Sequence, residues 1–111
     1  MELYIYIEAE ELEDVAEPMV EAIVPWIGNK NEKTKLVNQI AEGFVGVNMT
    51  VTSKNGLKKP LIFLYDLAKE HKCDFVVGIL DTETGAMEDV CYFGHEEGRP
   101  DMFEIGSYLG L

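Results

Sequence analysis

The fold of this 111-residue chain is decided by residues 44–52, which read FVGVNMTVT. Apolar side chains alternate here with small or polar ones, which is the period of a strand that buries one face. Residues 53–56 then have the composition of a turn, and residues 57–71 carry apolar side chains at helical spacing. Ser53 and Asn55 are the candidates to cap this helix. The stretch therefore predicts a half-buried strand followed by a helix.

The beginning of the chain predicts a second pair of a strand and a helix. Residues 3–8 alternate Leu and Ile with Tyr, so both faces are apolar or aromatic, as in a strand well inside a sheet. Residues 12–27 place apolar side chains three and four apart, with acids on the opposite face. Pro18 either kinks this helix or marks the start of its better-formed part, and Pro25 helps to end it.

The remaining elements follow from shorter signals. A continuous apolar run within residues 74–81 predicts a buried central strand. Arg99-Pro100-Asp101 opens a short final helix, because proline suits the first helical position. The other predicted segments are a loop at 28–32, a weak strand at 33–40, a hairpin turn at 82–85, a strand at 87–93 and a loop at 94–98.

The order of these elements predicts an α+β protein. We expect one compact domain over residues 1–111, with a mostly antiparallel sheet and helices packed on it. The first six elements follow a ferredoxin-like βαββαβ order, which a C-terminal strand and helix extend. Because this architecture carries many unrelated functions, function has to be argued from side chains.

Charge is unevenly distributed along the chain. The 21 acidic and 9 basic residues give a net charge of −12. Residues 1–29 contribute −8, residues 30–72 contribute +4, and residues 73–111 contribute −8. This balance argues against a nucleic-acid partner, and no apolar run approaches the ~20 residues that span a membrane. Without a basic N-terminal segment, and with only two cysteines, we expect reduced thiols and a cytoplasmic location.

Catalytic and cofactor-binding signatures are absent from the sequence. No glycine-rich phosphate loop is present, and Cys91 falls in a predicted core strand rather than beside an activating group. We therefore predict no catalytic residue, no cofactor and no enzymatic activity. The only ligand set that tetrahedral zinc would accept is His71, Cys73, Cys91 and His95, and two buried thiols with two surface imidazoles explain it better.

Acidic residues form the strongest candidate for a binding surface. One group precedes and enters the first helix, from Glu8 to Glu17. A second group lies on the hairpin of the last two predicted strands and in the segment after it. In simple alternation Glu88 faces away from Asp89 and shares its face with Tyr92, so an aromatic ring lies among carboxylates. Such a surface suits a basic protein, because charge steers the encounter and the ring anchors it. The predicted contact residues are Asp81, Glu83, Glu88, Asp89, Tyr92, Glu96, Glu97 and Asp101.

In length, net charge and lack of catalytic machinery, the chain resembles small immunity proteins that neutralise toxins, including those of contact-dependent inhibition systems. The resemblance implies a basic toxin domain as partner, often a nuclease, whose active cleft the acidic protein covers. Two alternatives remain open. One is a ferredoxin-like regulatory domain that senses a ligand or forms oligomers through its strand edges. The other is a small enzyme that uses its carboxylates as general acid and base.

Overall fold

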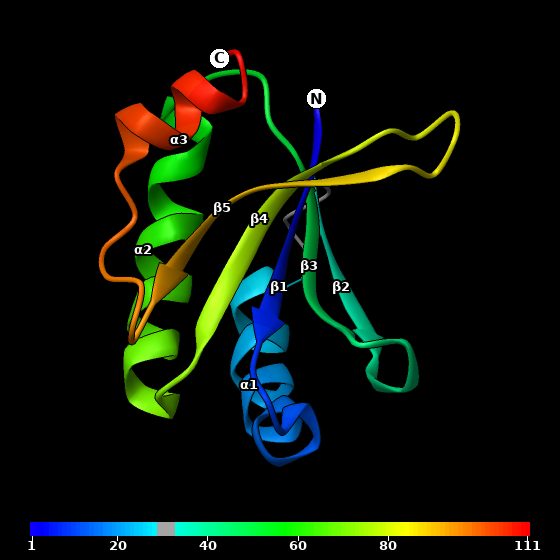
Figure 1. Cartoon of the computed structure of the whole chain (residues 1–111), viewed down its shortest axis with the longest axis vertical. Helices are drawn as coiled ribbons and strands as arrows, with labels where there is room; N and C mark the ends of the chain where they lie inside the picture. The colour runs from blue at the N-terminus through cyan, green and yellow to red at the C-terminus, as the bar shows by residue number, and fades with distance from the viewer. Residues whose placement is uncertain (29–32) are drawn as a thin grey trace.

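A single five-stranded sheet organises the chain (Figure 1). The computed structural model describes residues 1–28 and 33–111, so most of the loop predicted at 28–32 lies outside the described residues. The elements are β1 (Glu2–Glu8), α1 (Leu12–Ile27), β2 (Thr34–Gln39), the 3-10 helix η1 (Ile40–Glu42), β3 (Phe44–Thr50), α2 (Asn55–His71), β4 (Asp74–Leu80), β5 (Met87–Gly94) and α3 (Met102–Tyr108).

The strands lie in the order β2-β3-β1-β4-β5, and every neighbouring pair is antiparallel. The predicted α+β class is thereby confirmed. Because β5 extends the sheet beyond β4, the strand order is not strictly ferredoxin-like. β1 is central, because it pairs with β3 along one side and with β4 along the other. This position explains why its residues are apolar or aromatic on both faces.

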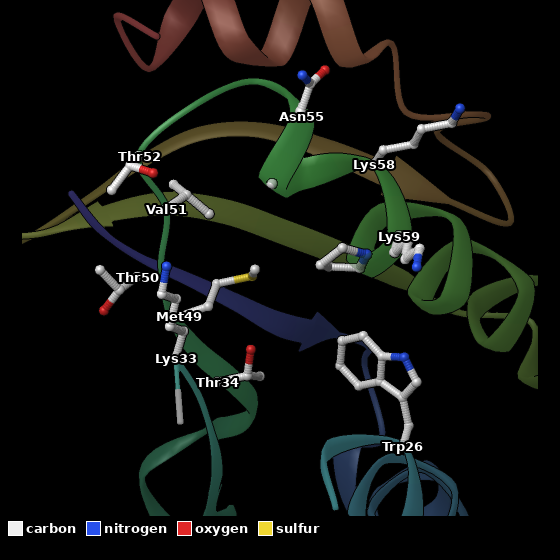
Figure 2. A pocket seen from close by; sticks show the side chains of 12 residues that line it. Trp26, Lys33, Thr34, Met49, Thr50, Val51, Thr52, Asn55, Lys58 and Lys59 are labelled. Carbon is white, nitrogen blue, oxygen red and sulfur yellow. The ribbon is translucent and has the colours of Figure 1, made fainter. Parts of the chain in front are cut away.

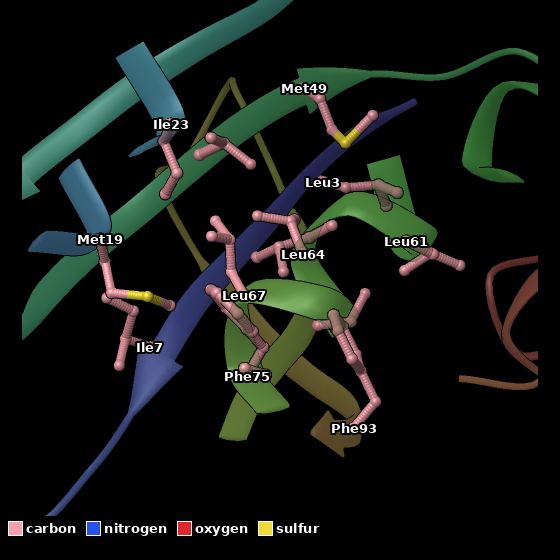
Figure 3. Packing of buried hydrophobic residues seen from close by; sticks show 14 of the residues in the cluster. Leu3, Ile7, Met19, Ile23, Met49, Leu61, Leu64, Leu67, Phe75 and Phe93 are labelled. Carbon is pink, nitrogen blue, oxygen red and sulfur yellow. The ribbon is translucent and has the colours of Figure 1, made fainter. Parts of the chain in front are cut away.

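The helices cover one face of this sheet, which we call the covered face. Leu3, Ile5 and Ile7 of β1 point into a continuous apolar core shared with the helices. Figure 3 shows Met19 of α1 and Leu64 of α2 reaching toward β1 from two directions. Phe75 of β4 and Phe93 of β5 stack with ring centroids 5.4 Å apart at the far side of this core. The apolar side chains that the helical and strand periods predict therefore pack in one core.

The helix ends only partly follow the sequence signals. α1 contains both Pro18 and Pro25 and ends at Ile27, whereas α2 begins at Asn55 with Lys54 as its N-cap and no side-chain cap. The prediction that Ser53 or Asn55 caps α2 was therefore wrong. Asp101 does cap α3, where its carboxylate accepts hydrogen bonds from two backbone N–H groups of the first turn. No helix in the described ranges is long and apolar enough to cross a bilayer.

The opposite, open face of the sheet buries aromatic side chains without help from a helix. Tyr4 is 1% exposed and Tyr6 is 6% exposed, and the apolar residues around them all belong to strands. Their ring centroids lie 5.0 Å apart, and Phe44 continues the row at 5.5 Å from Tyr6. The Tyr6 hydroxyl donates a hydrogen bond of 2.6 Å to Asn48. Large rings and satisfied hydroxyls thus order a face that no helix covers.

A β-bulge in the pairing of β4 with β5 decides which side chains share the open face. The register shifts between Val77 and Gly78, so that Tyr92 pairs with Val76 while Asp89 pairs with Gly78. The extra residue reverses the alternation along β5. Tyr92 therefore lies on the same face as Asp89, and the prediction that it shares a face with Glu88 was wrong.

Candidate functional site

Tyr92 lies at the centre of an acidic surface at the β5 edge of the open face. Its side chain is 46% exposed although a strand holds its backbone. The charge of Asp89 raises the pKa of Tyr92, with further contributions from Glu8 and Glu97. These carboxylates come from β5, from the end of β1 and from the loop after β5. We call Tyr92, Asp89, Glu8 and Glu97 the acidic tyrosine surface.

Asp89 is held in place from below by Tyr4. The Tyr4 hydroxyl donates a hydrogen bond to the Asp89 carboxylate, linking the central strand to the edge strand. Burial, and then this hydrogen bond, raises the pKa of Tyr4. The ring lies so close over Gly78 that a Cβ built there would stand 2.0 Å from the Tyr4 Cζ atom. Glycine at this position therefore allows the contact that orients the carboxylate.

A hollow of about 220 Å³ adjoins Tyr92 and contains three of the predicted contact residues. Tyr92, Glu97 and Asp101 line it together with Glu104 and Tyr108 from α3, and Arg99 is the one basic residue of the described lining. Tyr108 is 56% exposed, and its hydroxyl donates a hydrogen bond of 2.6 Å to Glu104. Two tyrosine rings thus lie among carboxylates, which is the combination expected of an anchor for a cationic side chain.

Acids from both ends of the chain converge on a second hollow of about 410 Å³. Its lining includes Glu10 from the segment before α1, Asp14 from the first turn of α1, Asp74 of β4 and Glu96 from the loop after β5, together with Lys72. Glu8 lines this hollow and also acts on Tyr92, so the hollow and the acidic tyrosine surface are continuous. Antiparallel pairing causes this convergence, because it brings the last residue of β1, the first residue of β4 and the last residue of β5 to the same end of the sheet.

The hairpin residues of the predicted set lie elsewhere. Asp81 and Glu83 are at the tip of the β4–β5 hairpin, which extends away from the helices (Figure 1). The eight residues of β5 separate that tip from Glu96, a span of roughly 25 Å for an extended strand. Backbone N–H groups of the turn bind the Asp81 carboxylate and lower its pKa, so this residue shapes the hairpin. The eight predicted residues therefore do not form one patch.

Sequence reasoning missed Glu104 and Tyr108 as parts of the surface. Their spacing of four on a predicted helix was a usable signal, since side chains at i and i+4 are neighbours. Asp74 was also missed as an organiser of the loop after β5. Its carboxylate accepts hydrogen bonds of 3.0 and 3.1 Å from the N–H groups of Glu96 and Glu97. That contact spans more than twenty residues, so no local pattern could reveal it.

The four residues considered for a metal site are not brought together. Within residues 1–28 and 33–111, no group of three or more His, Cys, Asp or Glu side chains is placed to hold a metal ion. Cys73 lines the second acidic hollow, whereas Cys91 lines the hollow beside α3. Burial raises the pKa of each thiol to about 11, so both are protonated near neutral pH and are poor ligands and nucleophiles.

Comparisons of the chain with protein-family models, with curated proteins and with solved structures found no match.

Proposed function

We propose that this chain is an acidic binding protein that neutralises a basic partner through its acidic tyrosine surface. The most concrete form is an immunity protein that covers the active cleft of a basic toxin domain, such as a nuclease, in the cytoplasm. The observation that carries the proposal is that the exposed Tyr92 ring lies close enough to carboxylates from three separate segments for their charges to act on it. A nuclease binds polyanionic substrate through a positive cleft, and a complementary acidic surface competes for it.

The support beneath the surface favours binding over simple solvation. The bond from Tyr4 holds Asp89, and the bonds from loop N–H groups hold Asp74 below Glu96 and Glu97. These bonds order the Asp89 side chain and the backbone of the loop that carries Glu96 and Glu97, and groups that are already ordered lose less conformational entropy when a partner binds. Carboxylates that serve only solubility need no such support, because a solvated rim works equally well when its side chains are free.

The first experiment co-expresses the chain with the protein encoded by each gene that flanks its own. We expect one neighbour to arrest growth when it is expressed alone and to be neutralised by this chain. The two proteins should co-purify at low salt and separate progressively as salt rises, since exposed charges are screened. If neither neighbour is toxic, or if a toxic neighbour is not neutralised, the immunity role is wrong.

The second experiment locates the interface with charge-reversal variants and one variant that removes the aromatic ring. Glu97→Lys, Glu8→Lys and Tyr92→Ala should each weaken co-purification, with Tyr92→Ala costing about 2 kcal/mol as a central aromatic anchor. Glu17→Lys and Glu21→Lys on α1 make the same charge change at exposed positions outside the surface. If the α1 variants weaken binding as much as the others, net charge rather than this surface is responsible.

A further inference from the structure

Basic residues line a cleft that shares no described residue with the acidic tyrosine surface. Its volume is about 410 Å³, and it lies between the end of α1, the start of β2, the end of β3 and the first turn of α2 (Figure 2). The lining residues are Trp26, Lys33, Thr34, Met49, Thr50, Val51, Thr52, Asn55, Gly56, Lys58, Lys59 and Pro60.

The charge of this cleft is opposite to that of the whole protein. Among the described residues, its lining contains Lys33, Lys58 and Lys59 and no acid, although the chain carries 21 acids against 9 bases. Like charges around one concavity repel one another, and the low-dielectric walls strengthen the field inside. A bound anion would relieve this repulsion, so the cleft favours a negatively charged ligand.

The first turn of α2 adds to the same field. The N-terminus of a helix is the positive end of its dipole, where acidic side chains are the stabilising choice. α2 has no acid in its first turn and no side-chain cap, and it begins with Lys54 at the N-cap. In this turn the N–H groups of Gly56 and Leu57 already donate to the carbonyl oxygens of Ser53 and Lys54, so an anion here is attracted by the helix dipole and the lysines. The lysines stand where they oppose helix stability. Such a local conflict is expected where function, rather than folding, selects the residues.

Thr34 is a separate sign of a ligand in this cleft. It is 4% exposed and occupies a position on the covered side of β2, opposite Met49, where strand alternation calls for an apolar side chain. Figure 2 shows its hydroxyl oxygen directed into the space between Met49 and Trp26. None of the side-chain hydrogen bonds within the described parts of the chain involves this hydroxyl. Among the described residues no buried side-chain polar atom lacks a partner, so Thr34 is not an orphaned group. Its side chain lines the cleft, where a ligand can reach the hydroxyl.

Trp26 supplies an apolar wall. Phe63 stacks on its ring with centroids 4.4 Å apart and planes 9° apart, which fixes the indole beside the cleft. Figure 2 shows Trp26 reaching from α1 toward Lys59 and the start of α2. A ligand in this space meets lysine side chains at one side and an aromatic ring at the other.

We propose that the basic cleft binds a small phosphate-bearing ligand. The phosphate group lies at the first turn of α2 beside Lys58 and Lys59, the Thr34 hydroxyl donates to one of its oxygens, and the apolar part of the ligand rests on Trp26. The proposal is independent of the acidic tyrosine surface, because the cleft would hold its ligand whether or not a basic partner exists.

Trp26 makes the proposal directly testable, because it is the only tryptophan in the chain. The experiment follows its fluorescence while phenyl phosphate, inorganic phosphate or benzyl alcohol is added at constant ionic strength. We expect a saturable change with phenyl phosphate, a weaker response to inorganic phosphate, and none with benzyl alcohol. The absence of a saturable response to either phosphate would overturn the proposal.

The matched variants test the residues that hold the phosphate. Lys58→Gln combined with Lys59→Gln should weaken phenyl phosphate binding by at least about tenfold, since two charge-assisted contacts are lost. Lys69→Gln combined with Lys72→Gln removes the same charge at the other end of α2 and should leave binding unchanged. Equal losses in the two double variants would show only a general charge effect and would overturn the site.

Thr34→Val separates a ligand-binding hydroxyl from a structural one. We expect weaker phenyl phosphate binding with an unchanged or higher thermal midpoint without ligand, because the variant buries a methyl group in place of a hydroxyl. A lower midpoint with unchanged binding would assign the hydroxyl to the fold and would overturn its part in the site.

Discussion

The two faces of the sheet both bury side chains, but by different means. On the covered face, Leu3, Ile5 and Ile7 belong to one apolar core that includes residues of α1, α2 and α3. On the open face, Tyr4 and Tyr6 are almost as inaccessible, yet only strand residues surround them. Burial on the covered face comes from a second layer, whereas burial on the open face comes from a row of large rings that pack against one another at tilts of 31° and 33°.

This difference teaches where a partner can bind. The helices fill the core of the covered face, although apolar side chains such as Ile62 and Phe103 remain exposed on the outer side of the helices. The open face is equally ordered but has no helical layer, and the hydroxyls of its buried tyrosines reach polar partners at its surface. A rigid, uncovered face with an exposed ring at its edge is suited to recognition, because its residues are positioned before the partner arrives. Four predictions test this contrast, from the largest effect to the smallest.

Truncating the covered face should cost the most. Phe75→Ala removes a side chain that is 0% exposed and stacked on Phe93, and we expect the free energy of unfolding to fall by about 4 kcal/mol. Urea unfolding followed by circular dichroism measures this loss. A loss below that of the open-face variants described next would contradict the view that the covered face carries most of the stability.

Crowding the open face should cost slightly less. In Gly78→Ala the new Cβ would stand 2.0 Å from the Tyr4 Cζ atom and 2.4 Å from the carbonyl oxygen of Glu88, so we expect a loss of about 3 kcal/mol. Gly56→Ala is the control, since its Cβ would meet only a Val51 methyl group at 3.8 Å. The same urea experiment should show little change for Gly56→Ala. Equal stability of the two variants would mean that Tyr4 does not lie tightly over Gly78.

Removing the polar partner of Tyr4 should have a moderate effect. Asp89→Ala leaves the Tyr4 hydroxyl without its acceptor, and we expect a loss of about 2 kcal/mol. In a double-mutant cycle, much of this loss should disappear when Tyr4→Phe is already present. Glu88→Ala, at the neighbouring exposed position, should cost less than about 0.5 kcal/mol. Additive effects of Asp89→Ala and Tyr4→Phe would contradict the coupling.

The smallest effect should come from titration of the covered-face thiols. Because burial raises the pKa of Cys73 and Cys91 from 9.0 to about 11, the folded state holds their protons more tightly than the unfolded chain does. The resulting stabilisation is complete below pH 9 and is lost as pH rises toward 11. After allowance for partial contact with solvent, we expect about 1 kcal/mol from each thiol.

Urea unfolding across this alkaline range measures the loss. Cys91→Ala should remove about half of the thiol contribution to the pH dependence and leave the part due to Cys73. Tyr4 adds to the decline only at higher pH, because its ordinary pKa of 10.0 is already above that of a thiol. A pH dependence that is identical with and without Cys91 would show that this thiol is not desolvated by folding.

Local signals in the sequence account for most of the elements but not for the site. The alternation at residues 44–52 and the apolar stripe at 12–27 correspond to β3 and α1. The alternation along β5 fails at the bulge, because an extra residue opposite Gly78 leaves no mark in composition. Glu8 could not be linked to Tyr92, because their proximity depends on how β1, β4 and β5 pair.

Sequence patterns alone establish the α+β class, the main apolar core and the division of charge into acidic ends and a basic middle. These properties depend on periodicity and composition, which act over a few residues. Only the tertiary structure decided that Tyr92 shares a face with Asp89, that acids from both ends meet at one edge, and that lysines from separate segments line a cleft. Strand register and helix docking set those distances, and both result from contacts between residues far apart in the chain.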